Sequence, residues 1–291
     1  MQGRRSAVIG TVLATIISVA LAAQTPQKGT GDAKAAAAPA FTTHLIDVGG
    51  RRVTFHVAPG RLPAVVFIAG GGEDGSSWNP VTAPIQRRTG AELITIDRAG
   101  FGESDEDTRP VRIENEVADV EAGLSALHVA QSFILVAHSY GGEVATSLVN
   151  RDPSRVAYAV LVDTSIPSFF TDEEITKFEA VLPKDMPTEN KEERTQAALF
   201  KVYPTLLHQF HQMDWPRSIP TTVIVSEHPP LATQAENTSW TEEHRKFAQA
   251  APNRSFVLAQ RSGHIVMTDR PDVVTDAVVL AVDQVRRSHR L

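Results

Sequence analysis

FILVAHSYGG, residues 133–142, is an apolar run that ends in a histidine, a serine and two glycines. Such a run predicts a buried strand that turns sharply, and residues 142–149 carry apolar side chains at helical spacing. A serine at the tip of a strand-turn-helix unit is lifted out of the sheet, where a base and hydrogen-bond donors can converge on its hydroxyl. The stretch therefore predicts an α/β fold with Ser139 as a candidate nucleophile.

Small residues lie two positions before and two positions after Ser139, at Ala137 and Gly141. They allow the strand and the helix backbones to pass closely at the turn. This spacing alone arises by chance about once in a chain of this size. An ordinary strand-helix turn is therefore the competing interpretation, and further segments are needed to decide.

A glycine-rich loop follows the strand that is predicted over residues 64–69 and begins with Gly70-Gly71-Gly72. A loop without side chains can offer backbone N–H groups to a developing oxyanion. A plain turn and a phosphate-binding loop are the alternatives. The phosphate interpretation is disfavoured because no Gly-Lys-Ser/Thr follows, and because Glu73 and Asp74 would place negative charge beside a phosphate.

A further predicted strand, residues 92–97, ends in the segment DRAGFGES, residues 97–104. This segment resembles the Asp-Arg-x-Gly-x-Gly-x-Ser motif of the α/β-hydrolases, in which it braces the loops around the active site. The resemblance implies a mostly parallel eight-stranded sheet flanked by helices, and a serine hydrolase of the capped, esterase-like branch. The family usually has Gly at the position of Ala137.

His264 lies in the segment RSGH, residues 261–264, between a predicted strand and a predicted helix. The segment resembles the catalytic-histidine loop of the family. Histidine suits a base because its ordinary pKa is close to neutrality, so it can take the serine proton and return it to a leaving group. We therefore expect His264 to be the base, and we expect the other histidines to have no such role.

Two residues are candidates for the acid of the triad, because the family order is Ser, then Asp or Glu, then His. Asp163 ends the predicted strand 157–163, and Glu227 follows the predicted strand 221–226. Relatives usually place the acid after the seventh strand, but residues 226–230 hold no Asp. A minority place it after the sixth strand, so Asp163 is favoured and Glu227 stays as the alternative. A turn-stabilising role is the competing interpretation of Asp163.

The resemblance also implies an oxyanion hole formed by the backbone N–H groups of Gly71 and Tyr140. Many relatives have a histidine before the first glycine of the loop, where this chain has Ala69, so the loop is expected to be braced differently. His138 points away from the reaction in the family and is not expected to act as a base. The implied mechanism is a two-step acyl transfer that needs no cofactor.

Strands and helices alternate along the chain, which predicts βαβ units and a mostly parallel sheet. The strands are predicted at 44–48, 51–58, 64–69, 92–97, 132–138, 157–163, 221–226 and 255–260. The helices are predicted at 78–89, 112–128, 140–150, 238–250 and 271–286. A length of 291 residues with 42% hydrophobic residues suits one catalytic domain, residues 41–291.

About 57 residues separate Asp163 from the strand at 221, far more than a crossover helix needs. Amphipathic helices are predicted at 171–182 and 191–210. In α/β-hydrolases such an insertion after the sixth strand forms a cap over the serine, so a cap is expected at about 165–218. The candidates for the substrate-binding wall are Phe169, Phe170, Phe210 and Trp215, with Phe178, Phe200, Tyr203, Leu206 and Leu207 in the same group. Packing of cap on core is the alternative for most of them.

His208 and His211 lie three residues apart and could face one metal ion, but no third ligand is apparent, so no metal site is expected.

Residues 1–23 resemble a Sec-type signal peptide, because Arg4 and Arg5 precede an apolar run that ends in Ala-Leu-Ala at 20–22. An uncleaved membrane anchor is the alternative, but the run is short for a spanning helix and contains Thr, Ser and Gly. We expect cleavage near Ala22, export to the periplasm or the medium, and no stable membrane anchor afterwards. Residues 24–40 have the composition of a disordered spacer.

The chain has a net charge of −6, which becomes −8 when residues 1–22 are removed, and it has no cysteine. An acidic chain is a poor partner for nucleic acid, so none is expected. Without cysteine, export places no disulfide requirement on the fold.

The predicted function is hydrolysis of a small carboxylic ester by an exported serine hydrolase. The alternatives are another chemistry of the same fold, namely C–C bond hydrolysis, an aminopeptidase or a perhydrolase, and a binding protein that keeps the fold without its chemistry.

Overall fold

The computed structural model of the protein describes residues 40–288. The predicted signal peptide, residues 1–23, and all but the last residue of the predicted spacer, residues 24–40, lie outside the described residues. The predictions for these two segments therefore stay predictions.

The described chain forms one eight-stranded sheet, in the order β1-β2-β4-β3-β5-β6-β7-β8. Only the pairs β1/β2 and β2/β4 are antiparallel, and every other neighbouring pair is parallel. The predicted mostly parallel eight-stranded sheet is thereby confirmed. The strands are β1 (Thr42–Asp47), β2 (Arg52–Ala58), β3 (Arg61–Ile68), β4 (Ala91–Asp97), β5 (Phe133–His138), β6 (Val156–Val162), β7 (Thr221–Ser226) and β8 (Arg254–Ala259).

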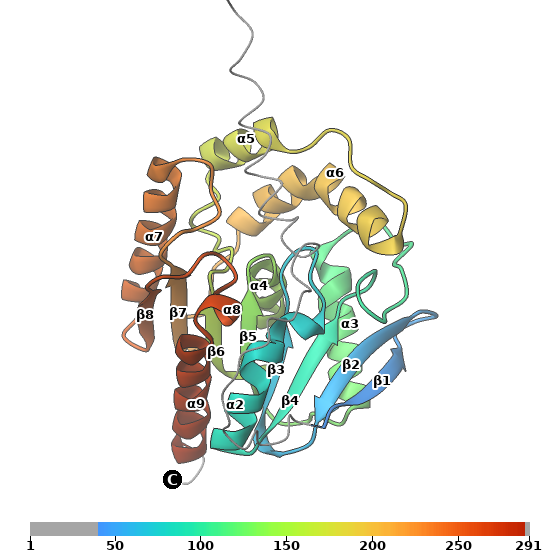
Figure 1. The fold of residues 1–291 in the computed structure, drawn as a ribbon, viewed down its shortest axis with the longest axis vertical. Helices are drawn as coiled ribbons and strands as arrows, with labels where there is room; N and C mark the ends of the chain where they lie inside the picture. The colour runs from blue at the N-terminus through green and yellow to red at the C-terminus, as the bar shows by residue number, and fades with distance from the viewer. Residues whose placement is uncertain (1–39, 289–291) are drawn as a thin grey trace, which may run out of the picture.

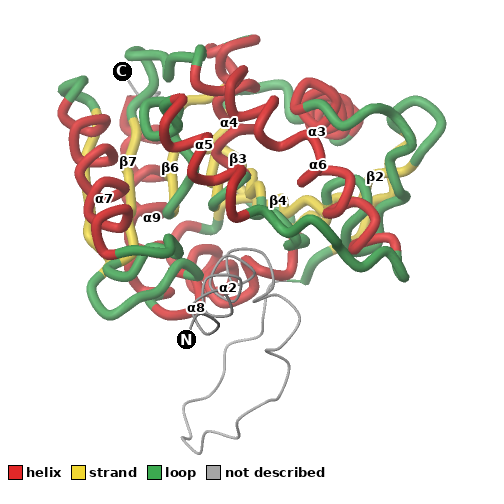
Figure 2. Tube along the Cα trace, turned by 90° about the horizontal axis from the view of Figure 1, so that it is seen from above, coloured by secondary structure: helices red, strands yellow, loops and turns green. Residues whose placement is uncertain are grey.

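Helices cover both faces of the sheet (Figures 1 and 2). One face carries α2 (Asn79–Thr89), α8 (Val266–Asp269) and α9 (Pro271–Ser288), whose apolar side chains form one core with the sheet. The other face carries α3 (Ile113–Ala126), α4 (Gly141–Arg151) and α7 (Gln234–Gln249), which contribute to a second core. The central strands β3, β5 and β6 are buried over most of their length because both of their faces are covered.

The predicted element boundaries agree with the structure to within three residues at nearly every end. The largest difference is at α7, which begins at Gln234 and not near residue 238. The side chain of Thr233 accepts a hydrogen bond from the N–H of Glu236, and the Glu236 carboxylate accepts one in return from the N–H of Thr233. This capping box stabilises a first turn that has no apolar periodicity, so the hydrophobic pattern alone does not reveal it. The short helix α8 was not predicted.

Two further helices, α5 (Asp172–Val181) and α6 (Lys191–His211), lie between β6 and β7 in the chain, at the position of the expected insertion. They lie across the carboxyl ends of the strands (Figure 1). Apolar side chains of α6 reach the core beneath it, since Leu207 and Phe210 are completely buried. The insertion is therefore packed on the edge of the sheet at which parallel strands end.

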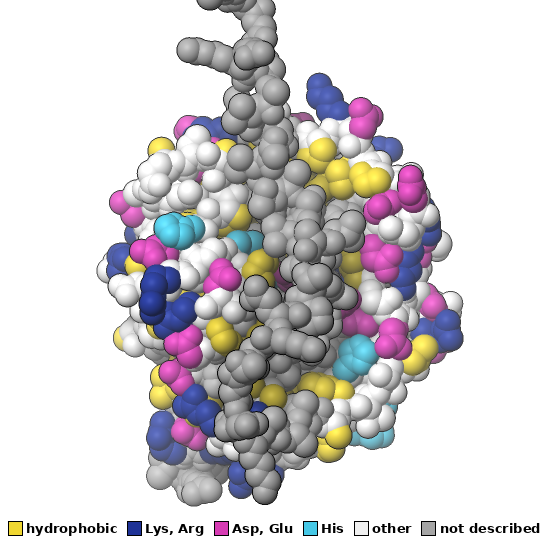
Figure 3. Space-filling view, in the orientation of Figure 1, with side chains coloured by type: hydrophobic (Ala, Val, Ile, Leu, Met, Phe, Trp, Pro, Cys, Tyr) yellow, Lys and Arg dark blue, Asp and Glu magenta, His cyan; other side chains and the backbone are white. Residues whose placement is uncertain are grey.

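The surface of the described residues carries both signs of charge. On the face shown in Figure 3, the basic and the acidic side chains are interspersed over the visible part of residues 40–288. Among the helices within 40–288, none has the length and the hydropathy that are needed to cross a membrane.

Candidate active site

Ser139 lies directly after β5 with a φ of 51°, in the left-handed region that residues with a side chain rarely adopt. The two glycines that follow start α4 and allow the close approach that this turn requires. A Cβ on Gly141 would lie 2.7 Å from the carbonyl oxygen of Ile68, and a Cβ on Gly142 would lie 2.4 Å from that of Ser165. The serine therefore occupies a strained turn that neighbouring backbone holds in place.

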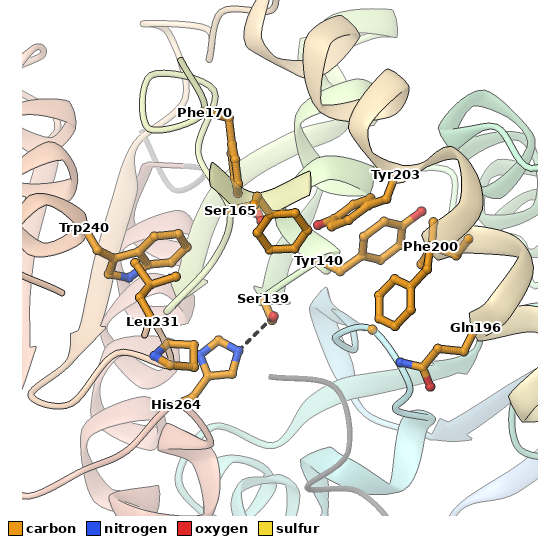
Figure 4. A pocket seen from close by; sticks show the side chains of 14 residues that line it. Ser139, Tyr140, Ser165, Phe170, Gln196, Phe200, Tyr203, Leu231, Trp240 and His264 are labelled. Atoms are coloured by element: carbon orange, nitrogen blue, oxygen red, sulfur yellow. Dashed lines mark hydrogen bonds between the residues drawn. The ribbon is translucent and has the colours of Figure 1, made fainter. Parts of the chain in front are cut away.

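The structure brings Ser139, His264 and Asp163 together, although they follow three different strands. His264 Nε2 lies 2.8 Å from Ser139 Oγ (Figure 4). His264 Nδ1 lies 2.8 Å from Asp163 Oδ2. An ionised carboxylate can only accept, so Nδ1–H donates to Asp163 and Nε2 accepts from the serine hydroxyl. This tautomer is the one that a general base for Ser139 requires.

Asp163 is completely buried and is surrounded by hydrogen-bond donors. Its Oδ2 accepts from the Ser226 hydroxyl at 2.8 Å as well as from His264, and its Oδ1 accepts from Ser226 N–H at 3.1 Å and Trp240 Nε1–H at 3.0 Å. Burial alone raises the pKa of a carboxyl, but His264, Trp240 and Ser226 together lower the pKa of Asp163 to about 2. The carboxylate is therefore ionised and held in one orientation.

Glu227, the alternative acid, lies apart from this arrangement. Its side chain is exposed, and its Oε2 accepts from the backbone N–H of Arg261 at 2.5 Å. That contact ties the end of β7 to the loop before His264. Of the two candidate acids, only Asp163 therefore lies within hydrogen-bond distance of the His264 ring.

The two expected oxyanion donors, Gly71 and Tyr140, lie next to each other at the cavity beside Ser139. A Cβ added to Gly71 would lie 3.7 Å from the Cβ of Tyr140, and both residues border the cavity that contains Ser139 and His264. Tyr140 is also the N-cap residue of α4, so the positive end of that helix lies at the same cavity. The site can thus place N–H groups and a helix N-terminus near an oxyanion.

Arg98, from the segment 97–104, connects the glycine-rich loop to Tyr140 and Glu116. Its buried guanidinium donates to the Gly70 carbonyl at 2.5 Å and to Glu116 at 2.9 Å, and it lies 4.9 Å from the centre of the Tyr140 ring. The Tyr140 hydroxyl donates to the same Glu116 carboxylate at 2.6 Å. These contacts hold the glycine-rich loop against the turn that carries the serine.

A cavity of about 610 Å³, including its opening to solvent, lies beside Ser139 and His264. Figure 4 shows the side chains of α6 and α7 pointing toward the serine from opposite sides. Aromatic and aliphatic side chains form most of its wall, with a few polar groups. The lining residues are Gly71, Ser139, Tyr140, Ser165, Phe170, Phe178, Gln196, Leu199, Phe200, Tyr203, Pro230, Leu231, Trp240 and His264.

The cavity separates the nine candidates for the substrate wall into two sets. Four of them border it, namely Phe170, Phe178, Phe200 and Tyr203. Five do not, namely Phe169, Leu206, Leu207, Phe210 and Trp215, which corrects that part of the prediction. Of these five, Phe169 packs edge-on against Trp240 at 4.8 Å between ring centres. Phe210, on α6, is completely buried, and Trp215 donates to Thr221 Oγ1 at 3.1 Å. These three rings pack the insertion and its ends onto the core, which was the alternative interpretation.

The insertion helix α6 supplies four wall residues at the spacing i, i+3, i+4 and i+7, namely Gln196, Leu199, Phe200 and Tyr203. The sequence predicts that these four residues share one face, because this spacing defines one side of a helix. Trp240 gave no such signal, since it depends on where α7 packs.

Glu143, one turn along α4 from Ser139, is a buried acid that the sequence did not single out. It has no exposed surface, and the Tyr203 hydroxyl donates to its Oε1 at 2.5 Å. Burial raises the pKa of Glu143 to about 8. The contact joins α6 of the insertion to the helix that follows the serine.

Replacing Glu143 with glutamine is expected to flatten the pH dependence of stability. The folded protein keeps the Glu143 proton up to about pH 8, whereas the unfolded chain loses it near its ordinary pKa of 4.5. The unfolding free energy of the unmodified protein therefore falls as the pH rises through this window, by a few kcal/mol. Urea unfolding between pH 5 and pH 9 gives the unfolding free energy of both proteins. The stability of Glu143→Gln relative to the unmodified protein should increase as the pH rises. Parallel curves would contradict the expectation.

The histidine pair of α6 does not converge on one point. His208 Nδ1 lies 3.2 Å from Asp172, and His211 Nδ1–H donates to the Pro167 carbonyl at 3.0 Å. Within residues 40–288, no group of three or more His, Cys, Asp or Glu side chains is arranged to hold a metal ion.

Comparison with known proteins gives one family and several relatives. A sequence profile described as "Alpha/beta hydrolase family" matches residues 65–277. The uncharacterised protein YqjL of Bacillus subtilis is 25% identical over 218 residues, which are 74% of this chain and 81% of YqjL. The protein BpoC of Mycobacterium tuberculosis, provisionally named a non-heme bromoperoxidase, is 35% identical over 100 residues. That match covers 34% of this chain and only 37% of BpoC.

Among solved structures, the enol-lactonase from Burkholderia xenovorans LB400 is similar with a TM-score of 0.58 and 21% identity. The similarity covers 82% of this chain and all of the lactonase chain.

Proposed function

Because the chain belongs to the α/β-hydrolase family, we propose that it is a serine hydrolase that cleaves a small carboxylic ester through an acyl-enzyme intermediate. The observation that carries the proposal is the continuous hydrogen-bonded line from Ser139 through His264 to Asp163. It supplies a nucleophile, a base and a group that orients the base, which is the set that acyl transfer needs.

The first half-reaction forms the acyl-enzyme. His264 Nε2 takes the proton of Ser139 Oγ as this oxygen attacks the ester carbonyl carbon. Asp163 holds the ring in the required tautomer and stabilises the imidazolium that forms. The tetrahedral intermediate then expels the alcohol oxygen, which receives the proton back from His264 Nε2–H.

The second half-reaction repeats these steps with water. His264 takes a proton from the water, whose oxygen attacks the acyl carbon, and Ser139 leaves with the proton that His264 returns. In both steps the negative charge develops on the former carbonyl oxygen. The N–H groups of Gly71 and Tyr140 are the proposed donors to it, because both residues border the cavity beside Ser139.

The cavity wall supports a small, largely apolar substrate. Six of its lining side chains are aromatic rings from Tyr140, Phe170, Phe178, Phe200, Tyr203 and Trp240. One polar group stands out, because in the described part of the chain the buried Nε2 of Gln196 has no hydrogen-bond partner. An unmade bond of this kind is costly, and an oxygen atom of the substrate would satisfy it.

The proposal is tested with a series of chromogenic esters, from acetate to octanoate, and with a serine-directed phosphonate. Hydrolysis of at least one ester and covalent labelling of Ser139 are the expected results, with kcat/KM falling once the acyl chain exceeds the cavity. Labelling without turnover of any ester would favour C–C bond hydrolysis or an aminopeptidase activity. The absence of both labelling and turnover would favour a binding protein of the same fold.

Perhydrolysis is a second candidate, because the relative BpoC is provisionally named a non-heme bromoperoxidase. In perhydrolysis, hydrogen peroxide takes the place of water in the second half-reaction, so the same serine, histidine and acid would act. Peracid formation from acetate and peroxide at a rate far above that of ester hydrolysis would favour this function.

We further propose that the protein is exported to the periplasm or the medium. The support is the sequence of residues 1–23, in which two arginines precede an apolar run that ends in Ala-Leu-Ala.

A further inference from the structure

A second histidine, His138, lies beside the candidate triad and is 1% exposed. It ends β5, directly before Ser139, and its ring centre lies 4.6 Å from that of His264. Both of its ring nitrogens have partners. Nδ1 lies 3.0 Å from Glu73 Oε2, and Nε2 lies 3.0 Å from the backbone carbonyl oxygen of His264.

The partners of His138 determine where the protons lie. The His264 carbonyl can only accept, so Nε2 of His138 carries a proton. Glu73 Oε2 accepts from the Gly70 N–H at 2.9 Å as well, and Glu73 and His138 therefore share a second proton. Contact with His138 lowers the pKa of Glu73 to about 2 despite burial, and the pKa of His138 is raised by the same partner. The contacts and the two shifts together point to an imidazolium paired with a carboxylate.

This ion pair touches three of the segments that form the candidate active site. Glu73 holds the glycine-rich loop through Gly70, His138 is joined covalently to Ser139, and Nε2–H of His138 holds the backbone of His264. The packing leaves no space for a side chain at Gly70, where the glycine-rich loop meets Glu73 and His138. A Cβ on Gly70 would lie 2.9 Å from Glu73 Oε2 and 3.0 Å from His138 Nδ1.

Resting on the proposed acyl transfer, we propose that the Glu73–His138 ion pair is a positioning device that sets His264 and the Gly70-Gly71 loop against Ser139. A buried ion pair is a poor source of stability compared with apolar packing, so its two charges are better explained by the geometry that they impose. His138 is not a base for Ser139, because both of its ring nitrogens are hydrogen-bonded to Glu73 and to the His264 carbonyl.

Two substitutions, Glu73→Gln and His138→Gln, test the proposal. Glu73 Oε2 accepts two hydrogen bonds, from Gly70 and from His138. If the glutamine nitrogen lies at that point, it cannot accept from the Gly70 N–H, and that bond is lost. If the glutamine oxygen lies there, it carries no charge to stabilise the imidazolium, so His138 loses a ring proton and one of its two hydrogen bonds. We expect kcat for the best ester to fall about 10- to 100-fold with KM changed less than threefold, because a small misplacement of catalytic groups costs about that much. The rate of phosphonate labelling at Ser139 should fall in parallel.

The matched control is His56→Gln. His56 also pairs with an acid, through Nε2 at 3.1 Å from Asp97, but it lies on β2 away from Ser139. We expect its kcat to change less than threefold. Unfolding of all three variants is followed by urea, so that a loss of kcat is compared only between folded proteins.

Nitrogen NMR of His138 tests the ion pair without relying on activity. In ¹⁵N-histidine-labelled protein at pH 7, with His138→Gln to assign the signal, both ring nitrogens should be protonated. A neutral ring would overturn the inference, and so would variants whose kcat equals that of an active unmodified protein. An unmodified protein without esterase activity would contradict the proposed function instead, and the NMR result would still stand on its own.

Discussion

Ser139→Ala is expected to lower kcat for ester hydrolysis by about five to six orders of magnitude. The variant has no hydroxyl for His264 to deprotonate, so the acyl-enzyme cannot form. Loss of a triad serine costs about this much elsewhere, and the residual rate comes from the oxyanion donors and from binding. The measurement is kcat for the best ester of the series, with unmodified and variant protein purified side by side.

Ser139→Ala should fold normally, because the left-handed backbone at this position is equally demanding for serine and alanine and is held by surrounding backbone. Urea unfolding of the two proteins checks this. Unmodified rates in a folded variant would mean that the ester is cleaved elsewhere, and the assignment of Ser139 would then be wrong.

Asp163→Asn is expected to lower kcat by about four orders of magnitude, as loss of the orienting carboxylate does in other triads. Asparagine can present its NH₂ group to His264 Nδ1, which then has to accept. The ring proton moves to Nε2, and Nε2 can no longer take the proton of Ser139. The measurement is kcat for the same ester, together with the rate of labelling of Ser139 by the phosphonate.

Glu227→Gln is the matched control, with an expected change in kcat of less than threefold. Glutamine keeps an oxygen that can accept from the Arg261 N–H, and the side chain lies in solvent, away from the ring of His264. Equal, small losses in the two variants would contradict both assignments of the acid. A large loss only in Glu227→Gln would make Glu227 the acid.

Asp163→Asn also has a stability signature with a defined sign. The lowered pKa of Asp163 means that its carboxylate stabilises the folded protein above the unfolded pKa of 3.8, and that this contribution is lost as the pH falls toward 2. The variant should therefore be less stable than the unmodified protein at pH 7, and the difference should shrink at acidic pH.

The sequence by itself determined the class of the fold and two members of the candidate triad. The alternation of apolar strands and amphipathic helices is a local property, and so is the run of strand, tight turn and helix around Ser139. His264 was found from the resemblance of the short segment 261–264 to the catalytic-histidine loop of the family, and from its place after Ser139 in the chain. Where the signal is contained in one short segment, neighbouring residues carry enough information.

Only the tertiary structure decided between Asp163 and Glu227, because both end strands whose carboxyl ends meet at one edge of the sheet. The choice depends on donors from β7 and α7 that converge on Asp163 from residues 226 and 240. The cavity wall was decided in the same way, since Phe210 and Tyr203 share one helix but only Tyr203 reaches the cavity. The contact of Glu73 with His138 joins residues 65 positions apart. Such contacts depend on how separate elements pack against one another, and the pattern within each element does not contain that information.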